Sequence, residues 1–209
     1  MANGYKPELD VSRLLDAKRT NYYQNLIRIL RWAVELGRID IHYHVAIMSR
    51  FLSAPREGHL EQVFCIFAYV KRHLTYKLVM DSNEVLWNGK KFHDSDWSDF
   101  YADAKEELPP NMPAPRGKPV QINCFVDADH AGDMVSRRSH TGILIYVNRA
   151  PVIWFSKRQN TVETSTFGSE FIAMKIATEM IEGLRYKLRM FGVPLDGPAN
   201  VFGTTNPSF

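Results

Sequence analysis

The chain has only two cysteines among its 209 residues, Cys65 and Cys124, and both lie in apolar runs. Two such thiols exclude a disulfide framework and a cysteine-rich metal cluster, and they favour a reducing compartment. No apolar run approaches the roughly 20 residues of a membrane span, so no membrane is expected as a partner. The charged N-terminus lacks the hydrophobic core of a secretion signal. We therefore predict an intracellular protein, of the cytoplasm or the nucleus.

The chain also lacks a strong excess of charge of either sign. Its 26 basic and 23 acidic side chains give a net charge of +3, which permits nucleic acid as a partner without requiring it. The length suits one good-sized domain, or one small and one ordinary domain.

Hydrophobic residues in the first 80 positions recur every three or four residues, as they do in amphipathic helices. This spacing predicts a small bundle of three short helices, followed by a short strand at residues 76–80. Gly37 and Pro55 would end the first two helices. The expected buried stripes are Tyr22, Leu26, Ile29, Ala33 and Leu36; Ile41, Val45, Met48 and Leu52; and Leu60, Val63, Phe64, Phe67 and Leu74.

The sequence changes character after residue 80. Residues 81–119 are polar and end in a cluster of prolines, which predicts a linker or a long surface loop. Residues 120–209 then alternate in hydrophobicity, as half-buried strands do. We expect strands at 120–126, 141–148, 150–156 and 198–203, with one long helix ending at Gly192 before the last strand. This order predicts an α+β or α/β fold with a mixed sheet.

Two carboxylates in the second half are the candidate catalytic and metal-binding residues. Asp127 ends the first expected strand, and Glu170 begins the long helix on the stripe that packs against the sheet. Carboxylates brought together in this way repel unless a cation lies between them, and oxygen ligands select Mg²⁺ or Mn²⁺. The alternatives are a strand-end turn for Asp127 and an ordinary first-turn glutamate that stabilises the helix dipole for Glu170.

Several sequence blocks carry a family resemblance. "DADHAGD", "RRSHTG", "SKRQNTVETST" and "SEFIA" follow one another within residues 124–192. This stretch resembles the ribonuclease H-like region of copia-type retrotransposon polyproteins. The preceding residues, up to position 80, resemble the thumb-like and connection helices that link the polymerase to that region. The resemblance implies a helical segment at 1–80, a linker at 81–119 and a truncated ribonuclease H-like domain at 120–209.

The resemblance implies roles for individual residues. Asp127 and Glu170 match the carboxylates that hold divalent metal ions for cleaving the RNA strand of an RNA–DNA hybrid by a two-metal mechanism. Asp129 and Asp133 are not among the family's core ligands, and we expect them to be loop residues that order the turn, with Gly132 permitting it. The third catalytic aspartate of the family is replaced here by Thr204, a neutral and poor ligand. We therefore expect an incomplete active site and, without the "YxDD" motif, no polymerase activity.

Basic residues flank the expected hairpin of strands. Arg137 and Arg138 precede it, and Lys157 and Arg158 follow it, so they are candidates for following a phosphate backbone. The alternative is a set of ordinary solvated loop charges. Three basic residues of the long helix would extend this surface or form its charged outer face: Arg185, Lys187 and Arg189.

Three hypotheses for function follow. The first is a retroelement-derived fragment, catalytically impaired, that retains binding of RNA–DNA hybrid or another nucleic acid. The second is an active magnesium-dependent hybrid endonuclease in which Asp129 or Asp133 replaces the lost ligand. The third is a structural or interaction module whose open sheet edge, near residue 201, docks a protein partner.

Overall fold

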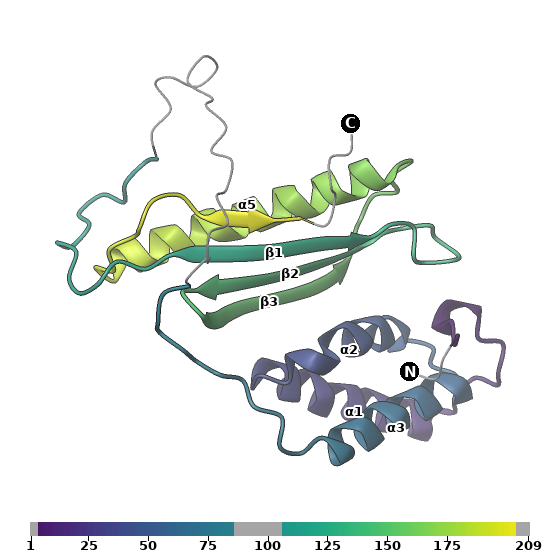
Figure 1. Cartoon of the computed structure of the whole chain (residues 1–209). Coiled ribbons are helices and arrows are strands. Elements are labelled where there is room, and N and C mark those ends of the chain that lie inside the picture. Colours follow the sequence, from purple (N-terminus) through teal and green to yellow (C-terminus); the bar gives the residue numbers. More distant parts are fainter. Residues whose placement is uncertain (1–3, 86–105, 204–209) are drawn as a thin grey trace.

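The computed structural model describes residues 4–85 and 106–203 (Figure 1). Within these ranges it contains four α-helices and one four-stranded mixed sheet, which confirms the α+β class. The helices are α1 (Ala17–Glu35), α2 (His42–Met48), α3 (Glu57–Arg72) and α5 (Thr166–Met190), and the strands are β1 (Ile122–Asp129), β2 (His140–Val147), β3 (Ala150–Arg158) and β4 (Asn200–Phe202). In these described ranges, none of the helices is long and apolar enough to cross a membrane.

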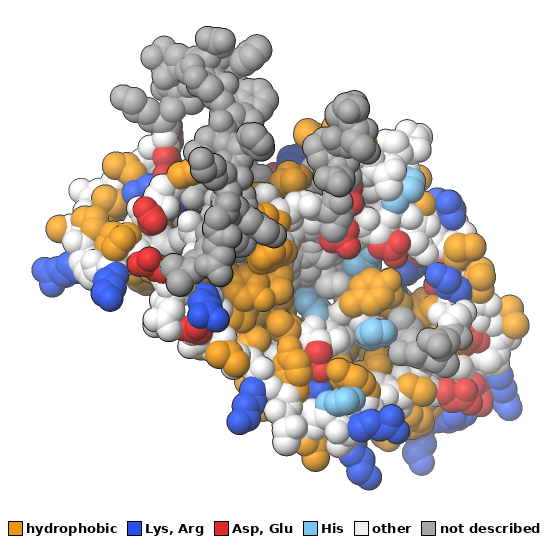
Figure 2. Space-filling model, viewed as in Figure 1, with side chains coloured by type: hydrophobic (Ala, Val, Ile, Leu, Met, Phe, Trp, Pro, Cys, Tyr) orange, Lys and Arg blue, Asp and Glu red, His pale blue; other side chains and the backbone are white. Residues whose placement is uncertain are grey.

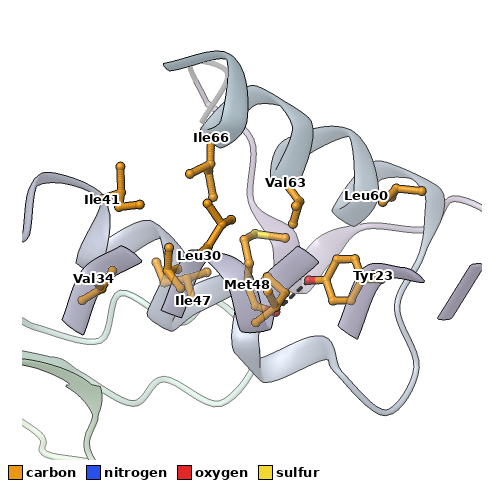
Figure 3. Packing of buried hydrophobic residues seen from close by; sticks show 11 residues of the cluster. Tyr23, Leu30, Val34, Ile41, Ile47, Met48, Leu60, Val63 and Ile66 are labelled. Carbon is orange, nitrogen blue, oxygen red and sulfur yellow. Dashed lines mark hydrogen bonds between the residues drawn. The ribbon is translucent and has the colours of Figure 1, made fainter. Parts of the chain in front are cut away.

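The first three helices pack around one hydrophobic core. Side chains from all three point toward one another in the close-up view (Figure 3). The Tyr23 hydroxyl is buried there and donates a hydrogen bond of 2.7 Å to the Met48 carbonyl, which joins α1 to the end of α2. The core therefore satisfies its one phenolic group while the rest of the contact is apolar.

The expected buried stripe of α1 was wrong by one position. The helix buries Tyr23, Ile27, Leu30 and Val34, whereas Ile29 and Leu36 of the expected stripe are 54% and 66% exposed. Because α1 carries apolar residues on two faces, the 3.6-residue period fits either face. The contacts with α2 and α3 decide which face is buried.

The strand expected at residues 76–80 was also wrong. The chain continues past the end of α3 without regular structure there, and Leu74, expected in the helix, is 75% exposed. A β-rich composition gives a strand only where a neighbouring strand supplies hydrogen-bond partners.

The sheet has the order β3-β2-β1-β4, in which β1 is antiparallel to β2 and parallel to β4. Helix α5 covers one face, and the helical bundle lies on the side of the other face (Figure 1). Trp154 of β3 packs against the bundle core from that second face. The α5 face buries Ile122, Cys124, Val126 and Ala128 of β1 against Ala173, Ala177 and Ile181.

The ends of α5 follow the expected capping pattern. The Ser165 side chain accepts a hydrogen bond from the Gly168 amide at 3.1 Å, which begins the helix. Gly192, with φ of +71°, adopts the left-handed conformation two residues after the last helical residue. These local signals fix where the start of the helix, with Glu170 just after its first turn, meets the sheet.

Candidate functional site

Asp127 lies near the carboxyl end of β1, on the face of the sheet that the bundle approaches. Val126 and Ala128, its neighbours in the strand, pack toward α5, so the alternation of the strand directs Asp127 to the other face. Its side chain is exposed, and its Oδ1 accepts a hydrogen bond of 2.9 Å from the Ala128 amide.

Glu170 is the fifth residue of α5, just after the first turn, and is half-buried, so the expected first-turn position was wrong by about one residue. The preceding residue, Ser169, is tied to the sheet through Gln159, whose amide nitrogen donates to the Ser169 carbonyl at 2.9 Å and to the Thr141 hydroxyl at 3.0 Å. Thr141 is the partner of Ala128 in the antiparallel pair of β1 and β2. The start of α5 is thus held at the end of the sheet where Asp127 lies.

The two predicted catalytic carboxylates therefore share one end of the sheet but start from its opposite faces. Within residues 4–85 and 106–203, no group of three or more His, Cys, Asp or Glu side chains could hold a metal ion. Thr204, which the family resemblance places at the position of the third aspartate, lies outside the described residues. The ligand set that the structure describes does not fit two ions, and metal binding by Asp127 and Glu170 stays a prediction.

Asp133 is a buried carboxylate in the loop after β1. It accepts backbone hydrogen bonds from Val135 at 3.1 Å and Ser136 at 2.7 Å, so it orders the turn as expected. It also forms ion pairs with Arg50, in the turn after α2, and with Arg158 at 3.1 Å. A carboxylate held by four donors in this way is a poor candidate for replacing the missing metal ligand.

Asp129 is exposed at the end of β1, and the Tyr43 hydroxyl lies 3.5 Å from its carboxylate. Gly132 was expected to permit this turn through its backbone freedom, but the structure gives another reason for a glycine there. The neighbouring Ala131 adopts a positive φ, whereas Gly132 does not. A Cβ on Gly132 would lie 2.2 Å from an oxygen of Asp129, so glycine is suited to the close approach of that carboxylate.

The predicted nucleic-acid-binding residues do not form one continuous surface. Arg137 is exposed and has φ of +56°, and Arg138 beside it is half-buried. Lys157 and Arg158 are consecutive in β3, so their side chains project from opposite faces of the sheet. Arg158 is engaged with Asp133, whereas Lys157 is exposed on the α5 side. The arginines of the 133–138 loop and Lys157 therefore belong to different sides of the sheet edge.

Two basic residues of α5 share one carboxylate as an ion-pair partner, which offsets one of their two charges. Arg185 and Arg189 each lie 2.6 Å from Glu106, and hydrogen bonds from Arg185, and then from Arg189, lower the pKa of Glu106 to about 2. Lys187, between them, is exposed. The outer face of α5 thus offers less positive charge to a phosphate backbone than its sequence indicates.

The contact region between the bundle and the sheet could not be predicted from the sequence. His140 is buried there, with its Nε2 2.8 Å from the Ser156 hydroxyl and its ring centroid 5.1 Å from that of Tyr43. Burial, and then the charges of Arg50 and other neighbours, lowers the pKa of His140 to about 4, so its imidazole is neutral at physiological pH. No local sequence pattern pairs residues so far apart along the chain.

Comparisons with known proteins bear on the origin of the chain. It is 26% identical to a retrovirus-related Pol polyprotein from transposon TNT 1-94 of Nicotiana tabacum, over 72% of this chain and 9% of that protein. It is 22% identical to a retrovirus-related Pol polyprotein from transposon RE1 of Arabidopsis thaliana, over 86% of this chain and 10% of that protein. The chain therefore spans about a tenth of these polyproteins, and the similarity supports an origin in a retrotransposon polyprotein.

A third relative is a small protein. The chain is 25% identical to the secreted RxLR effector protein 161 of Plasmopara viticola, over 80% of this chain and 94% of that protein. No protein-family profile and no solved structure matches the chain.

Proposed function

We propose that this chain is a retroelement-derived, ribonuclease H-like module of copia type that binds RNA–DNA hybrid and has little or no nuclease activity. The observation that carries the proposal is a threonine, Thr204, where the resemblance expects the third acidic ligand, in a chain similar to transposon polyproteins. Residues 204–209, "TTNPSF", add no carboxylate to the two candidates at the end of the sheet. No hydrolytic step is assigned to Asp127 and Glu170 because their ligand set is incomplete.

Hybrid binding would use the cations of the loop that joins β1 to β2. Arg137 is exposed there, and Arg138 is half-buried next to it, whereas Lys157 is exposed on the α5 side and would not share this surface. Asp133 accepts backbone hydrogen bonds within their loop and so fixes the backbone that carries the two arginines. Each phosphate that a cation neutralises releases counterions, so the affinity would fall as salt is raised.

A binding isotherm of a labelled RNA–DNA hybrid, measured at several salt concentrations, tests this proposal. The double variant Arg137→Gln/Arg138→Gln should reduce the salt slope by about one to two units, since each lost phosphate contact contributes about 0.9. Lys187→Gln is the matched control, because it removes an exposed cation from the outer face of α5. Binding without salt dependence, or an equal reduction of the salt slope in Lys187→Gln, would count against hybrid binding by the 133–138 loop.

The second candidate function is that of an interaction module. The match across 94% of a small effector protein supports it, because a unit of this size occurs there almost alone. In the described sheet β4 pairs only with β1, and its residue Val201 is exposed. Such an edge accepts an added strand from a protein partner.

Charge placed on this edge separates the second candidate from the first. Val201→Lys should weaken binding of a strand-adding protein partner by about tenfold or more, because edge lysines oppose strand addition. Val152→Lys is the matched control, since Val152 is an exposed valine on β3, the opposite edge of the sheet. Partner binding that survives Val201→Lys would exclude the β4 edge.

A further inference from the structure

A cleft of about 430 Å³ lies between the sheet and the helical bundle. Strand residues Phe125, Asp127 and Trp154 form one wall, and Tyr43 with His42 of α2 contributes to the other. In the space-filling view, hydrophobic side chains gather over the strands next to the bundle (Figure 2). A concave site between two packed units is a common place for a small ligand.

Aromatic rings dominate one wall of this cleft. The Phe125 ring stacks on that of Phe202, with centroids 5.0 Å apart and planes at 22°. Tyr146 meets Phe125 edge-on, with centroids 5.8 Å apart. Phe125 nevertheless stays 45% exposed, so its ring retains surface on which a flat ligand could stack.

The charge of the cleft selects among flat ligands. Of the described residues that line it, Asp127 is the one Asp, Glu, Lys or Arg side chain. His42 is half-buried, and burial lowers its pKa, so its imidazole is neutral at physiological pH. A carboxylate beside aromatic faces disfavours an anion such as a phosphate and favours a cation, through the ring quadrupoles and a charge-assisted hydrogen bond.

We propose that this cleft binds a planar organic cation, an amidinium or a guanidinium, which stacks on Phe125 and pairs with Asp127. The planar fork of such a cation matches a carboxylate with two parallel hydrogen bonds, which a compact ammonium does not. A small molecule or an arginine side chain of a protein partner supplies the same chemistry. This site is independent of hybrid binding, because it requires neither phosphate contacts nor a metal ion.

Titration with benzamidine tests the site, with neutral benzamide as the isosteric control and with a chelator present to remove divalent ions. Calorimetry should show benzamidine binding at least about tenfold more tightly than benzamide. Asp127→Asn should reduce benzamidine affinity by about tenfold, whereas Asp129→Asn should leave it within about threefold. Asp129 is the matched control, because it lies on the same strand and face but does not line this cleft.

Two further arms complete the experiment. Phe125→Leu should weaken benzamidine binding while the urea midpoint of the variant shows that it still folds. A short arginine peptide that binds more tightly than its lysine counterpart, and more tightly than benzamidine, would assign the cation to a protein partner. Tighter binding of benzamidine than of the arginine peptide would assign it to a small molecule. Equal affinity for benzamidine and benzamide, or full affinity in Asp127→Asn, would overturn the proposal. No nucleic acid is present, so this failure is distinct from a failure of hybrid binding.

Discussion

Asp133, in the loop after β1, forms an ion pair with Arg50, in the turn that follows α2, 83 residues away in the sequence. The Asp133 side chain is 2% exposed and the Arg50 side chain 21%. Arg158 of β3 binds the same carboxylate at 3.1 Å. One buried charge thus connects the bundle, the loop and the end of the sheet.

Asp133→Asn should destabilise the protein by about 2–3 kcal/mol, somewhat less than the loss of a fully buried pair because both arginines retain contact with water. Equilibrium unfolding in urea measures this change. Asp129→Asn, which removes a charge from an exposed neighbour, should cost less than about 0.5 kcal/mol. A change of similar size in the two variants would mean that the ion pairs of Asp133 do not stabilise the fold.

Close packing of α5 on the sheet should make its small residues sensitive to added volume. Ala177 has no exposed surface and packs against β1. Ala177→Leu should lower the free energy of unfolding by about 1–3 kcal/mol through overpacking. Thr178→Leu, on the exposed side of the same helix, is the control and should change stability by less than about 1 kcal/mol. A stable Ala177→Leu variant would contradict the packing of α5 described above.

His140 should make the protein less stable as the pH falls from 6.5 toward 4. Burial lowers its pKa from 6.5 to about 4, so between these values the unfolded chain binds a proton that the folded protein does not. The contribution of neutral His140 to the free energy of unfolding is therefore fully present above pH 6.5. It declines by up to about 3 kcal/mol as the pH falls. Unfolding in urea at a series of pH values measures the decline.

His140→Gln separates this contribution from those of other histidines. The pKa values of His42, His44 and His59 are also lowered, first by burial, so they add to the loss in the same pH range. The variant should reduce the slope of stability against pH without abolishing it. An unchanged slope would show that His140 is not neutral and buried in the folded protein.

Glu106 should contribute to the pH dependence of stability in a lower pH range than His140. Its pKa is lowered from 4.5 to about 2 by Arg185 and Arg189, so the folded protein loses stability as the pH falls from 4.5 toward 2. The carboxylate is 39% exposed, so the effect at neutral pH should be modest, below about 1 kcal/mol. Glu106→Gln should flatten the curve in this range, whereas Glu107→Gln should not. Equal curves for the two variants would contradict the ion pairs.

The secondary structure of the second half was largely predictable, because alternating strands and a capped helix are local patterns. The first strand nevertheless continues beyond the expected residue 126 to Asp129. Pairing of Ala128 with Thr141 and of Asp129 with His140 extends it, although the side chains of Asp127 and Asp129 are exposed. A hydrophobic pattern cannot predict the end of a strand when pairing with the neighbouring strand determines that end.

The first half and the site depended more on distant contacts. The choice between the two apolar faces of α1, Ile27 or Ile29, is made by the neighbouring helices. The partner of Asp133 in the bundle is likewise invisible to a local pattern. The ends of the strand and the helix alone place Asp127 and Glu170 at one end of the sheet, but their joint role as metal ligands stays a prediction. That the two residues start from opposite faces of the sheet could be seen only from the register of β1.

A nuclease assay tests the central claim most directly. The whole chain is incubated at high concentration with a labelled RNA–DNA hybrid in the presence of Mg²⁺ or Mn²⁺. The proposed loss of a metal ligand at Thr204 predicts no cleavage above that of the Asp127→Asn/Glu170→Gln variant. It also predicts that Thr204→Asp raises cleavage or metal affinity. Cleavage of the hybrid by the unaltered chain, abolished in the double variant, would contradict the account.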